Sequence, residues 1–246
     1  MHKKQVVPYQ EKEDSKKTQV RQMFNGISRR YDFMNRVISG GIDIKWRKNV
    51  VEILMAKKPE KILDVATGTG DLALALLQTG ASAIVGIDIS EGMLEIGRQK
   101  IKKSERDHKI KMVIGDSENM AFPNDYFDAV TVAFGVRNFE NLDQGLSEIC
   151  RVLRPGGDLV ILETAVPRNF LLRKCYLFYT QKIMPVIGKL FSKDRSAYEY
   201  LSESARAFPH GEAFNNILEK NGFIAVEDIP QTLGVVSIYR ANKPTI

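Results

Sequence analysis

The sequence is poor in cysteine, histidine and long apolar runs. It has two cysteines and three histidines in 246 residues, and neither type shows metal-ligand spacing, so we expect no metal site and no disulfide framework. No run approaches the roughly 18 apolar residues of a membrane span, and the first residues lack the apolar core of a signal peptide. These absences predict a cytoplasmic protein in which Cys150 and Cys175 are buried, reduced thiols.

The most informative segment that is present joins an apolar strand to a helix through a glycine turn, Leu63-Asp-Val-Ala-Thr-Gly-Thr-Gly-Asp71. Gly68 and Gly70 can adopt backbone angles closed to other residues, and they leave room for a ligand beside the turn. A second acid, Asp88, ends another apolar run about 20 residues later, where an acid would bind ribose hydroxyls. Together these residues predict a pocket for an adenosine-containing cofactor.

Charge at the glycine turn selects the cofactor. Asp71 begins the helix at the place where dinucleotide enzymes bind a pyrophosphate, and it would repel a diphosphate by about 4 kcal/mol at 4 Å. S-adenosylmethionine carries a sulfonium and an ammonium, so Asp64 and Asp71 would attract its methionine end. The alternative is that Asp64 and Asp71 only cap backbone amides. A nicotinamide oxidoreductase is the rival enzyme class, and Asp71 argues against it.

Strands and helices alternate along most of the chain. Strands are predicted at 61–66, 83–88, 110–114, 127–134 and 158–163, and helices at 70–78, 91–103 (capped by Ser90) and 142–153. A helix at 211–221 then precedes strands at 224–229 and 234–240, whose short link requires an antiparallel pair. We therefore predict an α/β, Rossmann-like methyltransferase fold, with a mostly parallel seven-stranded sheet and a terminal antiparallel hairpin.

Several segments resemble the menaquinone and ubiquinone biosynthesis C-methyltransferases over nearly the whole chain. The most specific are Tyr31-Asp-Phe-Met-Asn35 and Phe134-Gly-Val-Arg-Asn138, supported by Trp46-Arg47 and Leu153-Arg-Pro-Gly-Gly157. The length of 246 residues predicts one domain, 1–246. The resemblance implies that it is a methyltransferase with a prenylated quinol acceptor such as demethylmenaquinol; a polyprenyl benzoquinol is the alternative, and a non-enzymatic lipid-surface binding module is the remote one. It also implies that four residues contact S-adenosylmethionine: Thr69, Asp88, Asp116 and Ser117. Other members often have Asn-Ala in place of Asp116-Ser117.

The chemistry of ring methylation suggests roles for two further residues. A ring carbon attacks the methyl group only when the neighbouring hydroxyl is partly deprotonated. Arg137 and Asn138 follow the fourth strand, beside the switch point of the sheet, and we expect them to stabilise this oxyanion. Arginine cannot act as a base, so Asp71 and Glu163 are candidates for proton removal. The alternative for Arg137 is a surface ion pair with Glu140.

The remaining segments surround the cofactor core at 59–166. A helical cap is predicted at 15–58, a helical insertion at 167–208, and a helix with the hairpin at 209–246. The insertion is aromatic but contains Arg173 and Lys174, so it is predicted to lie on a membrane as a lid over the prenyl tail, with Phe178 and Met184 against the tail. A homodimer or packing arm is the alternative. The net charge of +6 favours an anionic membrane over nucleic acid.

Overall fold

One mixed sheet forms the centre of the molecule. The computed structural model describes residues 5–105, 108–183 and 194–245, and within them seven strands pair in the order β3-β2-β1-β4-β5-β7-β6. The strands are β1 (Lys61–Val65), β2 (Ala83–Asp88), β3 (Ile110–Ile114), β4 (Phe127–Ala133), β5 (Leu153–Thr164), β6 (Ile224–Gln231) and β7 (Val236–Asn242). β1 to β5 are parallel, whereas β7 is antiparallel to both β5 and β6. The predicted sheet and its terminal hairpin are confirmed.

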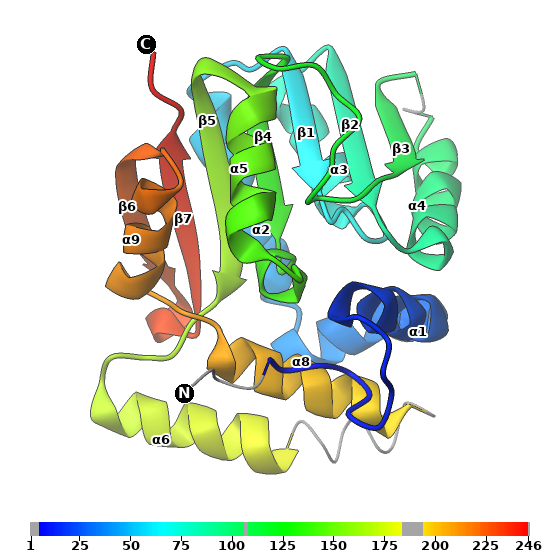
Figure 1. The fold of residues 1–246 in the computed structure, drawn as a ribbon, viewed down its shortest axis with the longest axis vertical. Coiled ribbons are helices and arrows are strands. Elements are labelled where there is room, and N and C mark those ends of the chain that lie inside the picture. The colour runs from blue at the N-terminus through cyan, green and yellow to red at the C-terminus, as the bar shows by residue number, and fades with distance from the viewer. Residues whose placement is uncertain (1–4, 106–107, 184–193, 246) are drawn as a thin grey trace.

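Helices cover both faces of the sheet (Figure 1). α2 (Asp43–Met55), α3 (Asp71–Leu76) and α4 (Glu91–Lys103) share one core cluster with the sheet, and α5 (Leu142–Val152) and α9 (Glu212–Lys220) share another. Successive strand residues enter opposite clusters, as Ile62 and Leu63 of β1 do, because side chains alternate across a strand. The two apolar layers hold the strand ends in fixed positions.

A third group of helices lies across the carboxyl ends of the parallel strands, where α1 (Lys16–Ser39), α6 (Phe170–Phe178) and α8 (Arg195–Ala207) gather (Figure 1). Met23 of α1 packs with Tyr198 and Tyr200 of α8 in a separate buried cluster. α1 is also tied to the sheet side, because Asn25 Oδ1 accepts hydrogen bonds from Ser90 Oγ at 2.8 Å and from Gly92 N at 2.9 Å. These helices therefore form a cap over the strand ends.

The predicted elements are present, and several differ in their bounds; the last two strands, predicted at 224–229 and 234–240, run over Ile224–Gln231 and Val236–Asn242. The strand at 110–114 and the helix at 91–103 have the predicted bounds, and Ser90 Oγ accepts from Met93 N as the predicted N-cap. The helix predicted at 70–78 ends at Leu76 and continues as the 3-10 turn η1 (Leu77–Thr79). β5 begins earlier than predicted, because Leu153 already pairs with Phe127 and the residues before Asp158 bulge out of the ladder.

No helix within the described part of the chain is both long and apolar enough to cross a membrane. The longest, α1, has 24 residues, but Lys16, Lys17 and Arg21 fall in its first two turns. The insertion is not one continuous helix either. α6 is followed by the five-residue π-helix η3 (Tyr179–Ile183), and α8 begins at Arg195.

Candidate functional site

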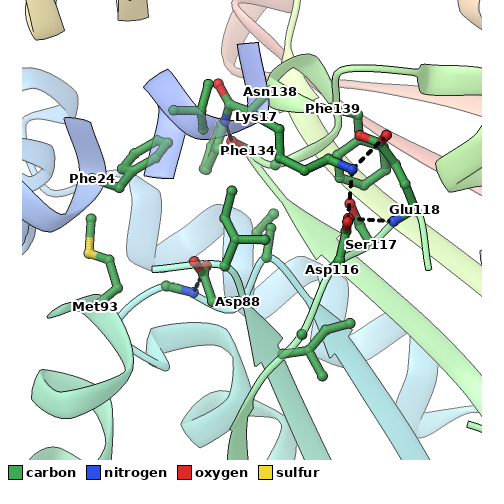
Figure 2. Close-up of a pocket in the computed structure, with 18 of the residues that line it drawn as sticks. Lys17, Phe24, Asp88, Met93, Asp116, Ser117, Glu118, Phe134, Asn138 and Phe139 are labelled. Carbon is green, nitrogen blue, oxygen red and sulfur yellow. Dashed lines mark hydrogen bonds and ion pairs between the residues drawn. The ribbon is translucent and has the colours of Figure 1, made fainter. Parts of the chain in front are cut away.

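A first cavity lies where β1, β2, β3 and β4 end, beneath α1 (Figure 2). It contains about 650 Å³ of empty space, part of it open to solvent. Its wall includes Gly68 after β1, Asp88 at the end of β2, and Asp116 and Ser117 after β3. The structure thus brings four of the predicted cofactor-binding residues together.

Asp88 supplies a fixed carboxylate to this cavity. Its Oδ2 accepts a hydrogen bond from Gly68 N at 2.9 Å, and its Oδ1 accepts from Ser90 N at 2.8 Å. Burial raises the pKa of Asp88 to about 6, although the backbone hydrogen bonds act in the opposite direction. Each carboxylate oxygen has a further lone pair for a hydroxyl donor. The tip of β2 can therefore hold the two neighbouring hydroxyls of a ribose.

Asp116 and Ser117 come from the turn after β3 (Figure 2). Asp116 Oδ1 accepts from Glu118 N at 2.9 Å, and its Oδ2 lies 2.7 Å from Lys17 Nζ. Lys17 Nζ also lies 3.1 Å from Glu118 Oε2. A ligand amino group that donates to Asp116 would therefore share this carboxylate with a lysine from α1.

The other three predicted cofactor-binding residues, Asp64, Thr69 and Gly70, do not line the cavity. Asp64 is buried beneath the glycine turn, where it accepts from Thr67 Oγ1 at 2.6 Å and from Thr131 Oγ1 at 2.7 Å. Burial raises the pKa of Asp64 to about 6. Gly70 has φ of +79° and precedes α3, a conformation that favours glycine. Asp64 and Gly70 therefore fix the conformation of the glycine turn without contacting the cavity.

Thr69 and Asp71 belong to an ionic cluster on the far side of the turn. Thr69 Oγ1 donates to Asp32 Oδ1 at 2.5 Å and accepts from Lys100 Nζ at 3.0 Å. Asp71 pairs with Lys100 at 2.7 Å and with Arg36 at 3.2 Å. Two cations thus already neutralise Asp71, and it does not line the cavity, so the expectation that it attracts a cationic ligand is corrected. The reason is that α1 places Arg36 over the turn.

A second, larger cavity adjoins the first, with about 1240 Å³ of empty space. Its wall is mainly apolar and aromatic, and it includes Tyr31, Ile38, Ile42, Trp46, Phe134, Tyr176, Tyr179, Leu201, Ala205 and Val236. These residues come from α1, α2, α6, η3, α8, the end of β4 and the start of β7. Tyr31 and Phe134 line both cavities. The two spaces therefore meet at these two rings.

Arg137 reaches the second cavity from the 3-10 turn η2 (Val136–Asn138). Its Nη1 donates to Glu163 Oε1 at 2.6 Å and to Phe134 O at 2.8 Å. The Arg137 and Glu163 side chains are only 7% and 0% exposed. The alternative of a surface pair with Glu140 is therefore wrong. Burial, the largest single influence, lowers the pKa of Arg137, but Glu163, Tyr31 and Tyr200 together outweigh it, so the pKa of Arg137 is raised.

Asn138, although next in sequence, lines the first cavity and not the second. Its Oδ1 accepts from Tyr200 Oη at 3.1 Å, and its Nδ2 donates to Phe134 O at 3.2 Å. Each amide atom thus makes one hydrogen bond to the protein. Arg137 and Asn138, predicted to act together, face different cavities on either side of their junction.

Sequence reasoning missed three residues that line these cavities, namely Lys17, Tyr31 and Arg47. Tyr31 lies within one of the two most specific segments of the chain. Its neighbours Arg30 and Asp32 are charged, so the local pattern gave no reason to place it between two cavities. Lys17 and Arg47 belong to a basic region that a solvated face would explain equally well. Only the packing of α1 over the strand ends and of α2 against the sheet brings all three to the cavity walls.

The fold and the two cavities define a class of protein. A mostly parallel sheet with a terminal antiparallel hairpin, a glycine turn after β1 and an acid at the tip of β2 are the features of a Rossmann-like, S-adenosylmethionine-dependent methyltransferase. The separate apolar cavity provides space for a second substrate beside the cofactor.

Sequence comparison places the chain more narrowly. Residues 12–243 match the ubiE/COQ5 methyltransferase family, to which this chain belongs. The chain is 45% identical over 240 residues to a demethylmenaquinone methyltransferase from Bacteroides fragilis, with 97% of each chain covered. It is 46% identical over 226 residues to the ubiquinone/menaquinone biosynthesis C-methyltransferase UbiE of Geobacter sulfurreducens, covering 91% of this chain and 88% of the other. The predicted family, methyltransferase activity and S-adenosylmethionine cofactor are confirmed.

Solved structures share the fold at low sequence identity. A SAM-dependent methyltransferase from Thermotoga maritima aligns with a TM-score of 0.62 and 19% identity, over 90% of this chain and 99% of the other. Phosphoethanolamine N-methyltransferase 2 of Haemonchus contortus, solved with S-adenosyl-L-methionine, aligns with a TM-score of 0.54 and 19% identity, over 75% of this chain and 49% of the other. These likenesses confirm the fold.

Proposed function

We propose that this protein transfers a methyl group from S-adenosylmethionine to a ring carbon of a prenylated quinol, converting demethylmenaquinol to menaquinol. The observation that carries the proposal is the junction at Tyr31 and Phe134 of a cavity that contains the Asp88 and Asp116 carboxylates with a larger, mainly apolar cavity. The names of the similar proteins from Bacteroides fragilis and Geobacter sulfurreducens support the same substrate class.

The first cavity fits the cofactor. Asp88 would accept the ribose hydroxyls and Asp116 the adenine amino group, while Ile87 and Phe24 offer apolar surface to the base. The cofactor, when bound, supplies an electrophilic methyl group. Since the two cavities share a wall at Phe134 and Tyr31, a ring seated in the second cavity would lie next to that group, and such positioning provides much of the rate in a displacement reaction.

The second cavity fits a fused ring with an apolar tail. Its lining is largely aromatic and aliphatic, and its empty space is about twice that of the first cavity. Burial of the tail stabilises the complex by about 0.8 kcal/mol for each methylene. Phe178 is 60% exposed and does not line this cavity, and Met184 lies outside the described residues. Six residues of the insertion line the cavity: Tyr176, Tyr179, Thr180, Leu201, Ser202 and Ala205.

Arg137 is the group best placed to favour the reactive anion. A phenol titrates near 10, so about 1.4 kcal/mol of anion stabilisation raises its ionised fraction tenfold. Glu163 holds the guanidinium in one orientation and offsets its charge, so Arg137 would act through directed hydrogen bonds. The ring carbon would form the new bond to the methyl group as the bond between that group and the sulfur breaks, with its electron pair left on the sulfur, and the ring carbon would then lose its proton. Neither Asp71 nor Glu163 lines either cavity, which leaves water as the acceptor.

A membrane-facing side would bring such an acceptor to the protein. Phe170, Leu171 and Phe178 of α6 are 71%, 68% and 60% exposed, and Lys174 lies over the Phe170 ring at 4.5 Å. Tyr176 of the same helix lines the second cavity. Exposed aromatic and basic residues on one helix are typical of interfacial contact. We therefore assign α6 to the inner face of an anionic membrane, in an otherwise cytoplasmic protein.

The test is an assay with methyl-labelled S-adenosylmethionine and two acceptors, a prenylated demethylnaphthoquinol and a polyprenyl benzoquinol. The proposal predicts label on a ring carbon of the naphthoquinol, located by mass spectrometry of the product. Transfer to the benzoquinol alone would assign the protein to ubiquinone synthesis. Label on oxygen, or no transfer to either acceptor, would refute the proposal.

A further inference from the structure

A second arginine lines the large cavity. Arg47 of α2 contributes to its wall together with Arg137 of η2. The Arg47 side chain is 11% exposed, close to the 7% of Arg137. A cavity that is mainly apolar thus has two nearly buried guanidinium groups, which enter it from different elements.

Both arginines are anchored in the same way. Arg137 uses Nη1 to bind Glu163, and Arg47 uses Nη1 to bind the Asp43 side chain, with a further bond to Asp43 O at 3.3 Å. Asp43 is itself held by a hydrogen bond from Ser39 Oγ at 2.8 Å. Each guanidinium therefore has a fixed direction and a partly compensated charge.

Each arginine also has a donor group to spare. Among the residues that the structure describes, Nη2 of Arg47 and Nη2 of Arg137 make no hydrogen bond. Neither atom is among the fully buried atoms without a partner, so both reach accessible space. Because an arginine fork binds oxygen anions and hydroxyls through such donors, the cavity offers two separate oxygen sites.

Tyr31 lies at the junction of the two cavities and is influenced by the guanidinium groups of both Arg47 and Arg137. It lines both cavities. Burial raises the pKa of the Tyr31 phenol, while both Arg137 and Arg47 act to lower it. Tyr31, Arg47 and Arg137 all line the second cavity, so both guanidinium groups share this space with the ring at the junction.

We propose that Arg47 is a positioning residue of the acceptor site, and that Arg47 and Arg137 each bind one of the two ring oxygens of the quinol. This inference rests on the proposed function. A quinol carries oxygens on opposite sides of its ring, and an oxygen buried without a partner is costly. Arg137 would bind the oxygen next to the methylated carbon, and Arg47 the oxygen across the ring. The site would thereby select a ring with two oxygens.

The experiment compares a prenylated quinol with a prenylated 1-naphthol that keeps only the hydroxyl next to the methylated carbon. kcat/KM for each acceptor is measured in wild type and in Arg47→Gln. The ratio of quinol to naphthol should fall about tenfold to a hundredfold in the variant, as for loss of a hydrogen bond to a charged group. Dividing the ratio measured in the variant by the ratio measured in wild type cancels the difference in intrinsic reactivity between the two rings. Lys48→Gln, an exposed neighbour on α2, should leave the ratio unchanged.

Two measurements separate positioning from folding. Affinity for S-adenosylmethionine should be unchanged in Arg47→Gln, because Arg47 does not line the first cavity. Arg47→Lys keeps the charge and the partner Asp43, and should restore part of the ratio. If folded Arg47→Gln has the wild-type ratio of quinol to naphthol, the inference is overturned. If Arg47→Gln does not fold, a wild-type ratio in Arg47→Lys would overturn it. If wild type methylates neither acceptor, the proposed function itself fails.

Discussion

The two cavities are built in different ways. The first is formed mainly by short turns at the ends of β1, β2, β3 and β4, so one rigid sheet fixes Asp88 and Asp116. The second is formed mainly by helices from distant parts of the chain, including α1, α2 and α8. The comparison teaches that cofactor binding follows from the sheet topology, whereas acceptor selection depends on how the cap packs.

The largest effect is expected where the second cavity meets the sheet. Arg137→Met would leave the buried Glu163 carboxylate without its cation, which costs about 3–5 kcal/mol of unfolding free energy. Turnover should fall as well, while affinity for S-adenosylmethionine stays near wild type because Arg137 is outside the first cavity. Urea unfolding, calorimetry and the methylation assay measure these three quantities.

The double variant Arg137→Met/Glu163→Gln sharpens this prediction. It removes both charges, so most of the lost stability should return while turnover does not. Wild-type stability in the single variant would show that the pair is not buried, and full turnover in the double variant would remove Arg137 from the reaction.

In the first cavity the main effect should be on the cofactor alone. Asp88→Ala removes hydrogen bonds from the ribose to a carboxylate, worth about 1.5–3 kcal/mol, or roughly tenfold to a hundredfold in affinity. The KM of the prenylated acceptor should change little. Calorimetry with S-adenosylmethionine measures the first quantity and steady-state kinetics the second. Unchanged cofactor affinity would remove Asp88 from the site.

The pH dependence of cofactor binding should follow Asp88. Burial raises the pKa of this carboxyl to about 6 in the free protein, and the ribose hydroxyls bind to its charged form. Affinity should therefore be nearly constant above about pH 7, fall to about half at pH 6, and fall about fivefold more from pH 6 to pH 5. Asp88→Asn does not titrate, so its weaker affinity should not show this step. Asp64 lies outside the cavity, so Asp64→Asn should still show the fall in affinity at low pH. If Asp64→Asn lost this pH dependence, the titration would belong to Asp64.

The smallest effect concerns α6. Phe170→Ser/Leu171→Ser should weaken sedimentation with vesicles that contain phosphatidylglycerol, because about 0.8 kcal/mol is lost for each methylene that no longer enters the membrane. Methylation of a tailless quinol should not change. Ile224→Ser is the matched control, since Ile224 is 49% exposed but starts β6, at the opposite end of the sheet from the cavities. Equal sedimentation of all three proteins would rule out α6 as a membrane contact.

The first cavity could be predicted from the sequence more completely than the second. Gly68 and Asp88 follow apolar strands, and parallel strands place their carboxyl ends at one edge, so local pattern was enough to bring these residues together. Asp71 was misplaced because its partners, Arg36 and Lys100, are 35 and 29 residues away in the chain. Hydrophobic periodicity does not show how α1 packs over the strands. For the same reason, the positions of Tyr31 and Arg47 in the cavity walls could not be predicted.

The central claim is that the second cavity holds the prenylated acceptor. The most direct test is kcat/KM as a function of tail length in wild type and in Ala205→Phe, which fills part of the cavity wall on α8. We predict that kcat/KM rises with tail length in wild type and stops rising at a shorter tail in the variant, with equal values for a tailless quinol. Asp88→Ala should lower every value by the same factor. A wild-type enzyme that ignores tail length, or an Ala205→Phe variant that loses all acceptors equally, would contradict the account.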